Sequence, residues 1–194
     1  MLEQGGLRLI FEWRGDRYAH RVSVAEGTGE RVLLESLEAS DAAAWPASPP
    51  LQQVHIESRG PEVAVALAVG MAGRSHWSAA CELDGRQRRV TFDIACRIAQ
   101  PAERLASGYR FGLPATQSEQ GRVILGPWEL VVEDDTRLVL SEAEADRIEI
   151  VPRAAPLAPA TARWPTCAIR PISWPTKFVP AFGWLAPTAR TTGR

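Results

Sequence analysis

Four polar side chains occupy one face of a predicted β-hairpin and carry groups suited to hydrolytic chemistry. His76 and Ser78 alternate along its first strand, Thr91 and Asp93 along its second, and the turn geometry predicts Asp93 directly opposite His76 or Ser78. A histidine can take the proton of a serine hydroxyl while an aspartate fixes the imidazole, which makes a hydrolase one hypothesis. A flat strand, however, lacks the sharp turn and paired N–H donors that an oxyanion requires. We therefore assign no catalytic residue and predict His76, Ser78 and Asp93 as ligand contacts.

The loop before this hairpin and a proline-rich connection supply two further candidates. Residues 70–75 read GMAGRS, in which two glycines permit positive φ and Arg74 can present a guanidinium to a carboxylate or phosphate. The loop has no Walker lysine and no Gly-x-Gly-x-x-Gly pattern, so nothing indicates nucleotide binding. Trp45 lies in the connection 41–50, beside Pro46. We predict Arg74 and Trp45 as ligand contacts near strand ends, where sandwich loops gather.

The spacing of histidines and cysteines does not predict a metal or cofactor site. His20, His55 and His76 are the only imidazoles, and they fall on three different predicted strands. The chain has three cysteines and no Cys-x-x-Cys pair, so a disulfide framework is not expected. Cys81 and Cys96 face the predicted core, where a thiol behaves as a small apolar group. We predict no metal and no cofactor.

Apolar residues recur with a period of two along most of the chain, which is typical of β-strands. Segments with this pattern are residues 7–13, 18–24, 32–37, 51–58, 63–71, 76–83, 89–98, 122–125, 128–133, 137–140 and 147–151. Residues 101–118 are predicted to form a loop, with single helical turns at 102–106 and 141–146. Many short strands separated by turn residues predict an all-β fold, either an antiparallel β-sandwich, which we favour, or a closed antiparallel β-barrel.

The hairpin of residues 76–83 and 89–98 gives the sharpest prediction of the core. A two-residue turn near Asp84 and Gly85 pairs odd positions with even ones, so two apolar sets meet on one side of the sheet. These sets are Trp77, Ala79, Cys81 and Leu83 on one strand, and Val90, Phe92, Ile94, Cys96 and Ile98 on the other. We expect both sets to be buried.

Charge divides the chain into two unequal parts. All 23 acids precede residue 152, against 16 of the 22 bases, so residues 1–151 carry a net charge of −7 and residues 152–194 carry +6. An acidic domain repels polyanions, so we expect no nucleic-acid partner. Residues 152–194 are rich in proline, and we predict a tail that is disordered, docks on a partner or a second copy, or lies as a strap on the domain. An altered reading frame in a GC-rich gene would also explain this composition.

No targeting or membrane signal is visible. Residues 1–10 lack a basic stretch followed by an apolar one, and no apolar run reaches the length of a transmembrane helix. We expect a cytoplasmic protein without a membrane partner.

Three short runs resemble an uncharacterised protein family of planctomycete-type bacteria. They are WPASPPLQQ at residues 45–53, GMAGRSHWS at 70–78 and FDIACR at 92–97, and the resemblance extends over about residues 7–151. It implies a folded domain, and it implies no activity, cofactor or partner.

Our leading hypothesis is a non-enzymatic β domain that binds a small ligand or a protein through its strand-end loops. The predicted contacts are Arg74, His76, Trp45, Asp93 and Ser78. The alternatives are a hydrolase using His76, Asp93 and either Ser75 or Ser78, and an assembly protein with a docking tail.

Overall fold

The computed structural model describes residues 1–38, 43–117, 122–132, 136–141, 144–153 and 160–172. Within these ranges the chain forms strands and no helix. The strands are β1 (Leu2–Gln4), β2 (Leu7–Trp13), β3 (Tyr18–Glu26), β4 (Gly29–Ser36), β5 (Gln53–Ser58), β6 (Val63–Ala72), β7 (Ser75–Asp84), β8 (Arg89–Ile98), β9 (Ser107–Phe111), β10 (Thr116–Gln117), β11 (Val123–Leu125), β12 (Trp128–Val132), β13 (Thr136–Leu140), β14 (Arg147–Pro152) and β15 (Ala160–Pro171). The predicted all-β fold is confirmed.

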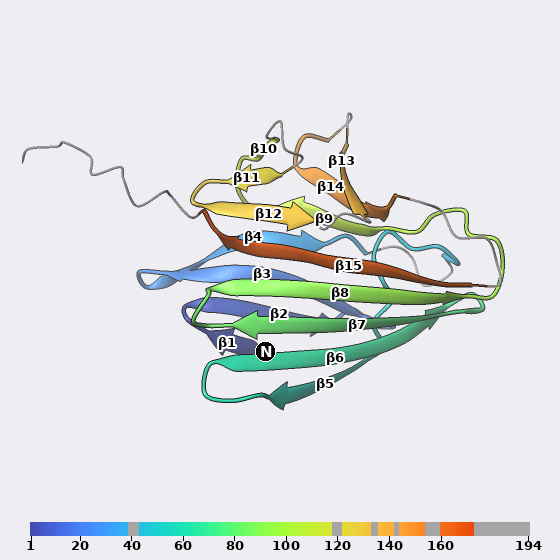
Figure 1. Ribbon diagram of the computed structural model, residues 1–194, viewed down its shortest axis with the longest axis horizontal. Helices are drawn as coiled ribbons and strands as arrows, with labels where there is room; N and C mark the ends of the chain where they lie inside the picture. Colours follow the sequence, from blue (N-terminus) through green and yellow to red (C-terminus); the bar gives the residue numbers. More distant parts are fainter. Residues whose placement is uncertain (39–42, 118–121, 133–135, 142–143, 154–159, 173–194) are drawn as a thin grey trace, which may run out of the picture.

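Two antiparallel sheets pack face to face (Figure 1). The seven-stranded sheet has the order β1-β2-β3-β4-β9-β14-β13, and the eight-stranded sheet has the order β10-β11-β12-β15-β8-β7-β6-β5. Each sheet has two edge strands and neither closes on itself. The structure is therefore a β-sandwich, and the barrel alternative is wrong.

The core lies between the sheets and is built from the alternation seen in the sequence. Every member of the two apolar sets on β7 and β8 is buried, with Phe92 at 1% and Ile94 at 4% exposure. The facing sheet contributes Leu7, Leu9 and Val22, which are fully buried. Side chains on alternate positions thus interdigitate between the layers, as expected for a sandwich.

The proline-rich connection 43–52 crosses from one sheet to the other at one end of the sandwich. The Ser48 hydroxyl donates to the carbonyl of Gly108 at 2.7 Å, and the Gly108 amide donates to the Ala47 carbonyl at 2.8 Å. At the other sheet, the Pro50 carbonyl lies against Gly70, where an added Cβ would stand 1.6 Å from its oxygen. This connection is therefore fixed to both sheets, and two glycines make its close approach feasible.

Three predictions need correction. Residues 160–171 fell within the predicted tail, yet they form β15 between β12 and β8 (Figure 1). Cys167 and Ile169 of this strand are buried. The sheet thus extends past the predicted domain boundary at residue 151, while residues 173–194 lie outside the described residues. The helical turn predicted at 102–106 is wrong, and β9 occupies part of the predicted long loop. The turn predicted at 141–146 includes residues 142–143, which lie outside the described residues, and across them the Glu144 amide donates to the Ser141 hydroxyl at 3.2 Å.

The three thiols are free and buried. Burial raises the pKa of Cys96 and of Cys167 to about 12 and that of Cys81 further still, so all three stay protonated at neutral pH. In the described parts of the chain, no helix has the length and hydropathy to cross a membrane.

Candidate functional site

The five predicted contact residues lie at different depths and on different elements. His76 and Ser78 are exposed on the outer face of β7, and Arg74 is exposed in the two-residue turn between β6 and β7. Asp93 is half-buried on the outer face of β8. Trp45 is half-buried in the connection and packs against the core. The structure brings only His76 and Ser78 together.

The structure places Asp93 opposite neither His76 nor Ser78, so its predicted pairing is wrong. His76 pairs with Arg97, and Asp93 pairs with Ala80. The cause is the turn, which holds four residues between Asp84 and Arg89, two more than predicted. Odd positions remain opposite even ones, but the pairing is displaced by two residues from the Ser78 register and by four from the His76 register. The buried faces were therefore predicted correctly while the polar neighbours were not.

The side chain of Asp84 explains why this turn is longer. Its Oδ1 accepts hydrogen bonds from the backbone amides of Arg86 and Gln87, at 2.9 and 3.0 Å. An aspartate that bonds to amides two and three residues ahead stabilises a local turn. Arg88 completes it with a φ of 49°. This turn sets the register of the hairpin.

The predicted serine, histidine and aspartate do not form a triad. His76 and Asp93 are separated by four residues along the sheet, about 13 Å. Ser75 is fully buried on the opposite face from His76. Asp93 therefore cannot orient the His76 imidazole as the aspartate of a triad does.

A hollow of about 450 Å³ opens on the outer face of the eight-stranded sheet, at the end where β6 turns into β7. Its lining residues come from the connection and from β5, β6, β7, β8 and β15, and they are Gln52, Gln53, Val69, Gly70, Met71, His76, Trp77, Ser78, Ala95, Arg97 and Thr161. We call this the β6–β8 hollow. It contains His76 and Ser78, but not Arg74, Asp93 or Trp45.

One wall of the β6–β8 hollow is apolar. Val69 and Met71 are 48% and 46% exposed, and Leu67 continues the row on β6 at 37%. Small residues, Ser78 and Ala95, follow on β7 and β8 and leave room beside these large side chains. A contiguous exposed apolar row with a hollow next to it is typical of a binding surface.

The opposite side of the β6–β8 hollow carries positive charge. Arg97 is the cross-strand partner of His76, which in turn is the cross-strand partner of Met71. Among the described residues, no carboxylate forms an ion pair with Arg97. The guanidinium therefore has donors available for an anionic ligand.

The side chain of Gln52 fixes one rim of the β6–β8 hollow. Its Oε1 accepts from the Met71 amide at 3.0 Å, and its Nε2 donates to the Met71 carbonyl at 3.3 Å. Two hydrogen bonds to one residue hold the end of β6 in place before any ligand arrives. Sequence reasoning missed Gln52 and Arg97, although alternation along β8 does place Arg97 on the outward face with Asp93.

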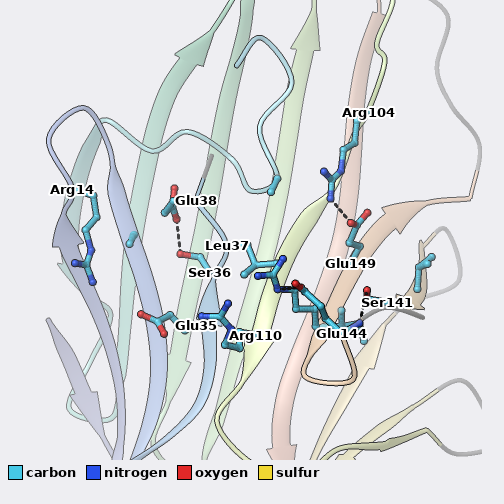
Figure 2. A pocket seen from close by; sticks show the side chains of 15 residues that line it. Arg14, Glu35, Ser36, Leu37, Glu38, Arg104, Arg110, Ser141, Glu144 and Glu149 are labelled. Carbon is cyan, nitrogen blue, oxygen red and sulfur yellow. Dashed lines mark hydrogen bonds and ion pairs between the residues drawn. The ribbon is translucent and has the colours of Figure 1, made fainter. Parts of the chain in front are cut away.

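A larger hollow, of about 700 Å³, lies against the seven-stranded sheet (Figure 2). Among its lining residues are four arginines and four glutamates, which are Arg14, Arg104, Arg110, Arg147, Glu35, Glu38, Glu144 and Glu149. Most of these charged side chains already form ion pairs within the chain. Arg104 pairs with Glu149 and Arg147 with Glu144, and Arg110 lies 3.1 Å from Asp146. A charged ligand would have to displace these pairs.

Glu38 stands at the buried side of this larger hollow. It accepts a hydrogen bond of 2.6 Å from the Ser36 hydroxyl, and that hydroxyl oxygen accepts one from the His20 amide at 2.8 Å. Burial raises the pKa of the Glu38 carboxyl, and the Ser36 hydrogen bond opposes that shift. This hydrogen bond joins the Glu38 carboxyl to buried Ser36 of β4 (Figure 2).

The described residues contain no cluster of three or more histidine, cysteine, aspartate or glutamate side chains suited to hold a metal ion. The three histidines lie apart: His20 in the core, His55 on edge strand β5 and His76 on β7. Comparison of the chain with protein-family models, with curated proteins and with solved structures yields no match.

Proposed function

We propose that this protein is a non-enzymatic binding domain whose ligand occupies the β6–β8 hollow. The ligand class is an anionic group joined to an apolar body, on a small molecule or at the end of a peptide. The observation that carries the proposal is the cross-strand row from Met71 through His76 to Arg97, which places a guanidinium two strands away from the exposed apolar side chains of β6.

The chemistry of the two sides favours this ligand class. A guanidinium donates two parallel N–H bonds to a carboxylate or phosphate, and the His76 ring can donate a third. Val69 and Met71 offer apolar contact area, and a thioether adapts to ligands of different shape. Ser78, which lines the hollow opposite Val69, supplies a hydroxyl. The larger hollow is less suited because its charges are already compensated.

Titration with octanoate tests the proposal. The methyl resonances of Val69, Met71 and Ala95 are expected to shift on addition of octanoate and to remain unchanged on addition of octylammonium, which has the same chain and the opposite charge. Arg97→Gln should weaken octanoate binding at least about fivefold, as loss of a charge-assisted hydrogen bond predicts. Arg59→Gln, an exposed arginine at the other end of the same sheet, should leave it unchanged.

Equal shifts with both probes, or unchanged affinity in folded Arg97→Gln, would contradict the proposal.

The tail of residues 173–194 lies outside the described residues, so docking through that segment stays a prediction.

A further inference from the structure

Strand β5 is an open edge of the eight-stranded sheet (Figure 1). Within the described residues it pairs only with β6. The other sheet edges are shorter: β1 has three residues, β10 two and β13 five, against six in β5. Proteins usually block a long edge with proline, lysine or a bulge, and the β5 sequence QVHIES has neither residue and no register shift. This edge is therefore open to another strand.

The backbone groups that face this edge belong to the even-numbered residues. The Arg59 amide donates to the Val63 carbonyl at 2.8 Å, so odd positions of β5 direct their hydrogen bonds to β6. The two-residue turn between Ala72 and Ser75 agrees, because it directs the even positions of β6 to β7 and leaves the odd ones for β5. The N–H and C=O groups of Val54, Ile56 and Ser58 thus point outward.

Two copies of β5 can pair antiparallel about a twofold axis. Only three registers do so while the outward N–H and C=O groups form hydrogen bonds and most of the strand overlaps. In the first, His55 stands opposite its own copy. In the third, Glu57 stands opposite its own copy and His55 opposite Arg59, which places like charges together. In the second, Ile56 pairs with Ile56 on the axis, and each His55 stands opposite the Glu57 of the other copy. Charge complementarity therefore selects the register centred on Ile56.

We infer that the occupant of the β5 edge is a second copy of this chain, paired antiparallel in the register centred on Ile56. The two His55–Glu57 contacts occupy non-hydrogen-bonded pairs, where side chains are closest. An imidazole N–H donates to a carboxylate, and within one chain these two side chains already lie 3.5 Å apart. The Ile56 side chain is 45% exposed in the single chain, and in this dimer it packs against Ile56 of the second copy. The result is one continuous sheet across both chains.

The interface is small, so the dimer is expected to dissociate in the micromolar range. Sedimentation equilibrium from about 5 to 500 μM should show a concentration-dependent shift from monomer to dimer in the full chain. His55→Glu sets carboxylates opposite each other and should raise the dissociation constant at least about tenfold. The double variant His55→Glu/Glu57→His exchanges the partners and should recover the dimer. His76→Glu, the same change on central strand β7, should have no effect on assembly.

Cysteine cross-linking tests the register independently. Ile56→Cys should give an oxidised dimer, because paired residues on the axis have Cα atoms about 5.5 Å apart, within disulfide reach. His55→Cys should cross-link poorly, because the two copies of position 55 are diagonal neighbours about 7–8 Å apart. The native thiols are buried and do not interfere.

A monomer at every concentration would overturn the inference. So would a dimer that His55→Glu leaves intact, or one in which position 55 cross-links as readily as position 56, because another surface or register would then hold it. None of these outcomes bears on octanoate binding, so the two proposals fail separately.

Discussion

His20 Nε2 lies 3.1 Å from the hydroxyl oxygen of Tyr109 at the centre of the sandwich. The two residues stand on β3 and β9, which are separated by β4, so this contact spans a strand. The imidazole also packs 5.6 Å from the ring of Phe92 on the opposite sheet. Burial lowers the pKa of His20 to about 4 and raises that of Tyr109, so both groups are neutral in the folded protein at neutral pH.

The protonation of His20 should make stability depend on pH. The pKa of this histidine is 6.5 without burial and about 4 in the fold, so below pH 6.5 the unfolded chain binds a proton that the folded one does not. The contribution of neutral His20 to the free energy of unfolding is expected to be fully present above pH 6.5. As the pH falls from 6.5 to 4, the free energy of unfolding should decrease by about 3 kcal/mol. Urea unfolding at several pH values measures this change.

His20→Gln is the matched variant for this test, and its unfolding free energy should fall less over the same range. The raised pKa of Glu38 acts in the opposite direction, because protonation relieves a buried carboxylate, and it offsets part of the loss. An equal fall in the variant and in the unaltered protein would show that His20 is not the titrating group.

Removing the Tyr109 hydroxyl should destabilise the protein. Tyr109→Phe leaves His20 Nε2 without its partner, and Nδ1 is already buried without a hydrogen bond in the described structure. The expected cost is about 1–3 kcal/mol, that of an unsatisfied buried polar group. Denaturant midpoints of Tyr109→Phe, His20→Phe and the double variant measure it. The double variant should lose less free energy of unfolding than the sum of the losses in the two single variants. Strictly additive losses would contradict a direct hydrogen bond between the two side chains.

The sequence predicted which face of a strand is buried more reliably than which residues stand opposite each other on neighbouring strands. Alternation along β7 and β8 identified the buried sets because a period of two survives any turn with an even number of residues. It could not give the register, which depends on Asp84 bonding to two amides of the turn. Strand β15 escaped detection because its register shifts between Trp164 and Cys167, which interrupts the alternation, and because Pro165 reads as a break.

The candidate site was predictable only in part. The outward positions of His76 and Ser78 follow from alternation, and the same pattern places Arg97 with them. The hollow itself depends on the sizes of side chains on three adjacent strands and on Gln52 from the connection, which no local pattern relates to each other. Arg74 was predicted as a contact from its loop, but it is not among the residues that line the hollow.

Strand β15 should be indispensable for folding. A chain that ends at residue 153 lacks the strand between β12 and β8, and it exposes the edges of both together with the apolar positions that Cys167 and Ile169 cover. It also lacks Arg170, which lies 2.8 Å from the buried carboxylate of Glu129. We expect this shorter chain to give no cooperative thermal transition by circular dichroism. A chain that ends at residue 172 keeps every described strand and should unfold cooperatively.

The contact between Gly70 and Pro50 should tolerate no side chain. Gly70→Ala places a Cβ 1.6 Å from the Pro50 carbonyl oxygen, and both sides of this contact are backbone, so neither can rotate away. The expected loss of unfolding free energy exceeds about 3 kcal/mol, in the range of severe overpacking. Gly29→Ala is the matched control, because its Cβ would meet only the Glu26 carbonyl oxygen at 3.7 Å, an ordinary contact. Urea denaturation should separate the two variants clearly. Equal midpoints would mean that the connection moves aside, and the rim that Gln52 holds at Met71 would then be adjustable rather than fixed.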